Sequence, residues 1–148
     1  MKTNKVLLAY GAVAILAGGL LLGCGQEAST DELISRAEQF IAKGDYRSAT
    51  IELKNAVAAD NANVRARWLL GKSYLESGDL QGAAKELARA RELGMADEEV
   101  LPLLAQALVL LDEHDALVAS NAEGLPAAAR AVVLAAQGLS TLAKGRIE

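Results

Sequence analysis

The side chains of this chain best suited to covalent or proton-transfer chemistry are one thiol and one imidazole. Cys24 is the only cysteine and His114 is the only histidine. A thiolate is a nucleophile, and an imidazole exchanges protons near neutral pH. Any cysteine–histidine or serine–histidine–aspartate arrangement would have to use His114 alone. We therefore expect no enzymatic activity, and we expect His114 to be a packing or surface residue.

Metal and cofactor sites are not indicated by the other residues either. Zinc sites need several cysteine or histidine ligands, and the chain has one of each. The acidic run at 112–115 lacks the ligand spacing of a calcium loop. Glycines do not form a phosphate-binding loop, since Gly18 and Gly19 lie in an apolar run and the others fit turns or close packing. The expectation is no metal and no cofactor.

Cys24 closes an apolar run at 6–22, which follows a short amino-terminal segment with two lysines. A basic start, an apolar middle and small residues at the exit are typical of a secretory signal. Two other interpretations are a transmembrane anchor, for which 17 residues is near the lower limit, and a free or disulfide-bonded thiol.

Leu21-Leu22-Gly23-Cys24 resembles the lipobox of bacterial lipoproteins. The resemblance implies that residues 1–23 are a lipoprotein signal peptide and that Cys24 begins the mature chain, with lipid on its sulfur and amine. It also implies a lipid-anchored protein of the cell envelope that faces the periplasm. Gly25, where aspartate would favour retention in the inner membrane, favours the outer membrane.

Removal of residues 1–23 would leave 125 residues, enough for one modest hydrophobic core. It removes two lysines and no acid, so 13 basic and 19 acidic residues remain. This acidic balance argues against a nucleic-acid partner. Alanine and leucine dominate the rest, proline and aromatic residues are few, and runs of alternating β-branched residues are absent. The composition therefore predicts an all-α fold.

The sequence after residue 29 repeats with a period of 34. The turn at Gly44-Asp45 recurs as Gly78-Asp79, 34 residues later, and again near Asp112. Apolar residues at helical spacing lie between these turns. A single helical hairpin cannot bury its apolar face alone, so this pattern predicts stacked hairpins.

Local signals place the ends of these helices. Ser29 and Glu32 fit a capping box at the start of the first helix. Gly44 and Gly78 stand where a left-handed backbone would end the first helix of each pair. In the third copy Asp112 replaces that glycine, and the second helix is expected to be short and to end before Gly124. A further first helix is expected at 131–143.

The second copy resembles the tetratricopeptide repeat (TPR). The residues that carry the resemblance are Leu70, Gly71, Tyr74, Gly78, Leu80, Ala83, Leu87 and Ala90. Trp68 stands one place late, with Arg67 in the usual aromatic position. The resemblance implies an α-solenoid of stacked antiparallel hairpins, preceded by a signal-peptide helix. The expected domains are the signal peptide at 1–23, a tether at 24–29 and a TPR domain at 30–148, with repeats at 30–63, 64–97, 98–130 (degenerate) and 131–148 (incomplete).

In that family the first helix of each pair lines a concave groove that binds protein partners. The residues that the resemblance places there are Glu38, Arg65, Trp68, Lys72, Glu76 and Gln106. Trp68, flanked by Arg65 and Lys72, is the best candidate contact, because tryptophan and arginine are common hot-spot residues. It is equally well suited to packing between adjacent repeats.

A narrower resemblance covers the lipobox and the first repeats together. The segments 41–46, 52–56, 67–71 and 98–105 are similar to the amino-terminal part of the TPR lipoprotein found with the exosortase and PEP-CTERM protein-sorting system. Bacteria with that system generally make exopolysaccharide. The resemblance implies a membrane-anchored scaffold for protein–protein interactions in that export system. The alternative is a general TPR lipoprotein that helps to assemble outer-membrane proteins or secretins.

Overall fold

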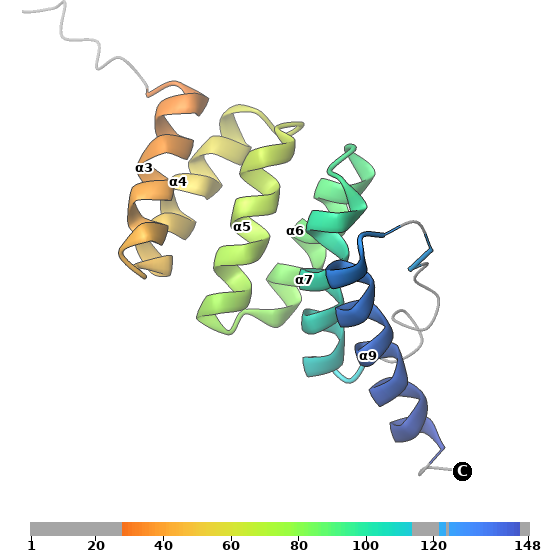
Figure 1. The fold of residues 1–148 in the computed structure, drawn as a ribbon. Coiled ribbons are helices and arrows are strands. Elements are labelled where there is room, and N and C mark those ends of the chain that lie inside the picture. The colour runs from red at the N-terminus through yellow and green to blue at the C-terminus, as the bar shows by residue number, and fades with distance from the viewer. Residues whose placement is uncertain (1–27, 114–121, 124, 146–148) are drawn as a thin grey trace, which may run out of the picture.

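The computed structural model describes residues 28–113, 122, 123 and 125–145 (Figure 1). Cys24, His114 and the expected signal peptide lie outside the described residues. The described helices are α3 (Thr30–Ala42), α4 (Tyr46–Ala59), α5 (Val64–Ser77), α6 (Leu80–Glu92), α7 (Asp97–Leu110) and α9 (Ala127–Lys144). No strand is found among the described residues.

Successive helices pack as antiparallel hairpins, and the hairpins stack along one direction (Figure 1). The closest helix pairs are α3 with α4 and α5 with α6, and α4 and α6 also pack on the first helix of the hairpin that follows. The order is therefore hairpin, turn, hairpin, with α3 and α5 on one side of the stack and α4 and α6 on the other (Figure 1). This confirms the predicted all-α solenoid.

The amino-terminal ends of the helices are fixed by side-chain caps. Ser29 and Glu32 form the expected capping box: the serine hydroxyl accepts from the Glu32 backbone N–H, and the Glu32 carboxylate accepts from the Ser29 N–H. At the starts of α4, α5 and α6, the side chains of Asp45, Asn63 and Asp79 each accept a hydrogen bond from the backbone N–H three residues later. Each cap satisfies a backbone donor that the first helical turn leaves unpaired.

The turns within the hairpins use a left-handed backbone. Gly44 has φ of 73° and Gly78 has φ of 86°, as the repeat pattern predicted. Asp112, at the same place in the third copy, has φ of 62°. The left-handed turn is therefore kept although aspartate replaces glycine. The aspartate side chain adds strain, because this conformation disfavours residues with a Cβ.

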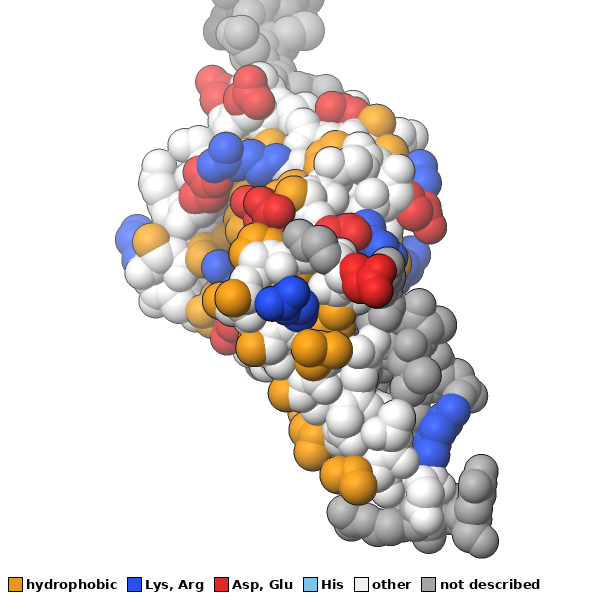
Figure 2. All heavy atoms as spheres, turned by 45° about the vertical axis from the view of Figure 1, so that its right-hand side comes forward, with side chains coloured by type: hydrophobic (Ala, Val, Ile, Leu, Met, Phe, Trp, Pro, Cys, Tyr) orange, Lys and Arg blue, Asp and Glu red, His pale blue; other side chains and the backbone are white. Residues whose placement is uncertain are grey.

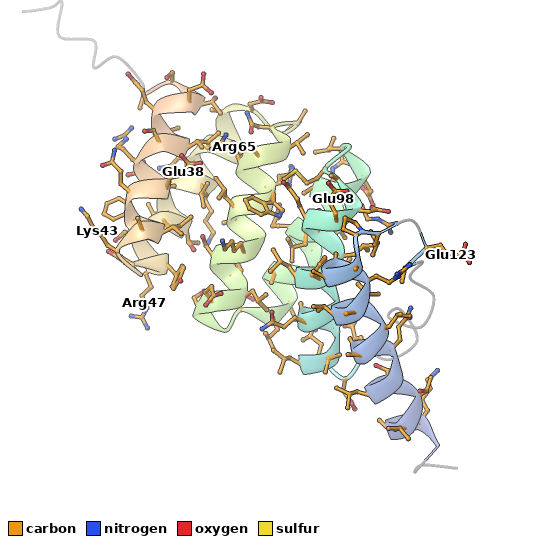
Figure 3. All side chains as sticks on the ribbon, in the orientation of Figure 1. Glu38, Lys43, Arg47, Arg65, Glu98 and Glu123 are labelled. Atoms are coloured by element: carbon orange, nitrogen blue, oxygen red, sulfur yellow. The ribbon has the colours of Figure 1, made fainter. Side chains whose placement is uncertain are left out.

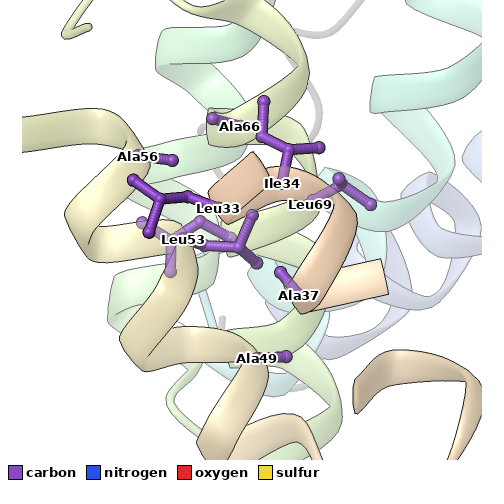
Figure 4. Packing of buried hydrophobic residues seen from close by; sticks show 9 residues of the cluster. Leu33, Ile34, Ala37, Ala49, Leu53, Ala56, Ala66 and Leu69 are labelled. Atoms are coloured by element: carbon purple, nitrogen blue, oxygen red, sulfur yellow. The ribbon is translucent and has the colours of Figure 1, made fainter. Parts of the chain in front are cut away.

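The core is built from small and large apolar residues that alternate between helices. In the first hairpin Ala37, Ala49, Leu53 and Ala56 are fully buried, and Leu53 lies among them (Figure 4). In the second hairpin the helices approach so closely that a Cβ on Gly71 would lie 2.7 Å from Leu87 Cγ. Small residues thus allow the helices to approach closely, and leucine side chains fill the space between them.

The last described helix differs from its prediction. A first helix was expected at 131–143, but α9 begins at Ala127. Pro126 holds the extended conformation just before it, and the alanines after Pro126 favour helix, so the helix starts a full turn earlier. Its inner side, with Val133 and Ala136, packs in one cluster with Leu101 of α7.

A candidate docking face on the first helices

The predicted site residues all lie on the first helices of the hairpins. Glu38 is on α3; Arg65, Trp68, Lys72 and Glu76 are on α5; and Gln106 is on α7. We call these six residues the docking face. Their helices lie in sequence along the stack, with α4 and α6 on its other side (Figure 1). The structure thus places the six residues on the first helices of three consecutive hairpins, and a shared binding groove stays a prediction.

One ion pair on the docking face joins two repeats. Arg65 Nε donates a hydrogen bond to Glu38 Oε1 at 3.0 Å, and a second guanidinium nitrogen contacts the same oxygen. Figure 3 shows the two side chains pointing toward one another from α5 and α3. Arg65 keeps 67% of its side-chain area exposed. The pair is therefore a surface contact of small energetic value that a ligand can reach.

Trp68 has packing contacts in the structure. It is half-buried and lies against two core clusters, one shared by the first two hairpins and one that includes Val100 of α7. Its indole N–H donates to the Glu99 carbonyl at 3.4 Å, and Lys72 Nζ lies 5.6 Å from its ring centroid. The indole thus links α5 to α7 and carries a cation on its face. A role in binding stays a prediction.

The remaining docking-face residues offer charge and hydrogen bonding to solvent. Glu76 and Gln106 are exposed, and Lys72 is half-buried beside Trp68. Together with Glu38 and Arg65, they give this part of the face both signs of charge around one aromatic ring. Such a surface suits a polar peptide that also presents an apolar or aromatic side chain.

A contact between the helices of the second hairpin was missed from the sequence. Arg67 Nη1 lies 2.6 Å from Glu86 Oε2, and Arg67 Nε donates to the Asn61 carbonyl at 2.7 Å. The available signal was Arg67 itself, because an arginine in the usual aromatic position needs a partner inside the hairpin. The pair lines a shallow depression of about 660 Å³ between α4 and α6. The other residues of its wall are Val57, Lys85, Ala88, Arg89 and Glu92.

The shifted pKa values belong to structural contacts. A hydrogen bond from Arg91 lowers the pKa of Asp97, and the same bond raises the pKa of Arg91. Hydrogen bonds from Ser48 lower the pKa of Asp45, which caps α4. Within the described residues, no group of three acidic, histidine or cysteine side chains is placed to hold a metal ion.

The described helices were also searched for membrane spans. None of them combines the length and the hydropathy that a bilayer crossing requires. The apolar run at 6–22 lies outside that search.

Comparison with known sequences bears on this geometry of capped, stacked hairpins. Residues 40–107 match the tetratricopeptide repeat family. The TPR match runs from the end of α3 through most of α7 and includes the Gly44 and Gly78 turns. TPR domains are generally non-catalytic scaffolds that bind protein partners, so the hairpin stack is that of a protein-interaction fold. Neither the curated proteins nor the solved structures that were searched gave a match.

Proposed function

We propose that this chain is a TPR scaffold lipoprotein of the bacterial cell envelope that binds a protein partner through its docking face. The proposal is supported by the positions of Glu38, Arg65, Trp68, Lys72 and Gln106 on the first helices of three consecutive hairpins. Aromatic and arginine side chains next to one another are typical of binding hot spots. Binding, rather than turnover of a substrate, is the activity that we assign.

The envelope location depends on Cys24. The lipobox pattern supports a lipid on this residue, and acyl chains contribute about 0.8 kcal/mol per buried methylene, so two or three chains hold a protein firmly at a bilayer. Mass spectrometry of the amino-terminal peptide from envelope fractions tests this. We expect a mature chain that starts at an acylated Cys24, and we expect Cys24→Ser to abolish the acylation. An unmodified thiol, or an uncleaved amino terminus, would contradict the proposal.

The biological setting that we propose is the exosortase and PEP-CTERM protein-sorting system, with its link to exopolysaccharide export. The similarity of segments 41–46, 52–56, 67–71 and 98–105 to the TPR lipoprotein of that system supports it. The alternative setting is assembly of outer-membrane proteins or secretins.

Affinity purification of the tagged full chain from detergent-solubilised envelopes separates the two settings. Enrichment of exosortase or polysaccharide-export components supports the first setting, and enrichment of secretin or outer-membrane assembly components supports the second. The same purification is repeated with a Lys72→Glu, Glu76→Lys double variant, which reverses two charges of the docking face and keeps its net charge. We expect this variant to recover less of the partner. Equal recovery of a partner by this variant would argue against binding at the docking face.

A further inference from the structure

The side of the stack formed by α4 and α6 carries cations that have no acidic partner. Lys43 lies in the turn before α4, Arg47 and Lys54 lie on α4, and Lys85 lies on α6, and all four are exposed. None of them forms an ion pair with another described residue. Figure 3 shows Lys43 and Arg47 pointing away from the stack. We call these four residues the basic side.

The acids of α4 and α6 are already engaged within the fold. Each of the three lies beside an arginine, in the pairs Glu52 with Arg36, Glu86 with Arg67, and Glu92 with Arg89. Asp45 and Asp79, which precede these helices, accept hydrogen bonds from the backbone of the first helical turn. The charge of the basic side is therefore not paired locally, and it attracts anions from solvent.

The cations of the two helices belong to one surface. Arg47, Ile51 and Lys54 follow one another at intervals of four and three residues, so they form one stripe along α4. Val57, one turn beyond Lys54, lines the same shallow depression as Lys85 of α6. Ile51 is 62% exposed between the two cations of its stripe. The surface thus presents one large aliphatic side chain among unpaired positive charges.

Other parts of the surface do not have this character. On the first helices Arg65 is paired with Glu38, and α3 and α7 carry three acids each, against one cation in α3 and none in α7. Figure 2 shows acidic and basic side chains beside one another on the face that it presents. Because the chain as a whole is acidic, an anionic surface attracts the α4–α6 side and repels the acid-rich helices.

We propose that the α4–α6 side lies against the anionic headgroups of the bilayer that holds Cys24, with Ile51 entering the interface between headgroups and acyl chains. The inference rests on the proposed function, which supplies the lipid on Cys24. Basic residues near a surface bind anionic lipids, and an exposed aliphatic side chain among them adds apolar contact. The docking face, on the other side of the stack, then stays open to a protein partner.

The length of the tether permits this arrangement. The five residue steps from Cys24 to Ser29 span at most about 18 Å, so α3 begins close to the bilayer. Helix α4 packs on α3 in an antiparallel hairpin. When the hairpin lies along the membrane surface, α4 and α6 reach the headgroups together.

The test uses the acylated full chain, reconstituted into vesicles of phosphatidylethanolamine and phosphatidylglycerol. Because the Cys24 sulfur carries lipid, an introduced cysteine is the only free thiol, and it takes a fluorescent label in Ile51→Cys or Lys72→Cys. A lipid with a nitroxide on its headgroup quenches labels near the membrane surface. We expect at least about twofold stronger quenching at position 51 than at position 72, since the basic side faces the headgroups.

The electrostatic origin of the contact is checked in two ways. Roughly 0.5 M sodium chloride, or vesicles of phosphatidylcholine alone, are expected to remove the difference between the two positions, because screening or loss of anionic lipid removes the attraction. The double variant Arg47→Glu, Lys85→Glu is expected to remove it too. The matched control is Arg65→Glu, Lys72→Glu with the label at position 51, which makes the same change in net charge on the docking face and is expected to keep strong quenching.

The outcomes separate this inference from the proposed function. If Cys24 is acylated but positions 51 and 72 are quenched equally, or equally well with and without anionic lipid, the inference fails alone. If Cys24 carries no lipid, the envelope location fails, and the inference fails with it. Energy transfer between two chains labelled at position 51, without quenching by the headgroups, would overturn the inference in favour of a second copy. Circular dichroism checks that each variant keeps the helical content of the parent chain.

Discussion

Arg67 Nη1 and Glu86 Oε2 lie 2.6 Å apart across the second hairpin, with 14% and 12% of their side chains exposed. The pair joins α5 to α6 in a position where the third and fourth repeats carry Leu101 and Leu134. The second hairpin is thus closed in part by a charge pair, at a position of α5 where the later first helices carry leucine. Pairs this little exposed are sensitive to the loss of either partner, because the remaining charge is left poorly solvated.

Arg67→Ala is therefore expected to lower the free energy of unfolding by about 2–4 kcal/mol, close to the cost of breaking a buried pair. The double variant Arg67→Leu, Glu86→Leu is expected to recover most of that loss, since both charges are removed together. Urea denaturation followed by circular dichroism measures both. If the double variant is as unstable as Arg67→Ala, two leucines cannot replace the charge pair, and the expectation is wrong.

Two glycines in the same register are predicted to respond oppositely to alanine. The Cβ of Gly71→Ala would meet Leu87 Cγ at 2.7 Å and the Leu87 backbone nitrogen at 3.1 Å, so it overpacks the second hairpin at a cost of about 1–3 kcal/mol. Around Gly138 the added Cβ meets no atom within 4 Å. Gly138→Ala is expected to stabilise α9 by about 0.5–1 kcal/mol, since alanine loses less backbone entropy. Thermal unfolding of both variants compares them, and a shift of the same sign in the two would contradict this difference in packing around the two glycines.

Ser73→Ala is predicted to stabilise the fold. The Ser73 hydroxyl is fully buried in α5 without a hydrogen-bond partner, and the equivalent position of the third repeat is the buried Ala107. Removing an unsatisfied buried hydroxyl is expected to raise the free energy of unfolding by about 1 kcal/mol. Ser35→Ala, at an exposed site on α3, serves as the control and is expected to change it by less than about 0.5 kcal/mol. Destabilisation by Ser73→Ala would mean that the hydroxyl is satisfied in solution.

The contact between Arg91 and Asp97 predicts a pH dependence. Arg91 donates two hydrogen bonds to the carboxylate, at 2.7 and 3.1 Å, and lowers the pKa of Asp97. A carboxyl whose pKa is lower in the folded state stabilises the fold above its unfolded pKa, near 3.9, and loses that contribution as the pH falls through the folded value. Both side chains are about half exposed, so the contribution is at most about 1 kcal/mol.

Asp97→Asn is therefore expected to be slightly less stable than the parent chain at pH 7, with a difference that shrinks below about pH 4. Arg91→Gln serves as the companion variant, because it removes the same contact from the other side. Chemical denaturation between pH 3 and 7 measures both. If the difference in free energy of unfolding between the parent chain and Asp97→Asn grows on acidification, the pKa of Asp97 is not lowered in the folded state.

The features predicted correctly from the sequence are those that depend on near neighbours. The capping box of Ser29 and Glu32 and the left-handed turns at Gly44 and Gly78 each involve a few consecutive residues, and the period of 34 extends them into a stack. The start of α9 was misplaced because the alanines after Pro126 extend the helix beyond the repeat pattern.

Features that depend on contacts between helices were harder to predict. The packing of Trp68 could not be decided because its indole donates to a carbonyl of another repeat, at Glu99. The pairing of Arg67 with Glu86 depends on how closely α5 and α6 approach, which follows from Gly71 and Leu87 together. Sequence similarity placed the six docking-face residues on the first helices, and contacts between them, such as the ion pair of Arg65 with Glu38, required the structure.

The most direct test of the docking face is photo-crosslinking of the full chain in the cells of its own host. A benzophenone amino acid is placed at Lys72, or at Ile51 on the other side of the stack, and crosslinked products are identified by mass spectrometry. We predict one discrete protein adduct from position 72 that is absent from position 51. The same adducts from both positions, or an adduct from position 51 alone, would contradict a partner bound on the first helices.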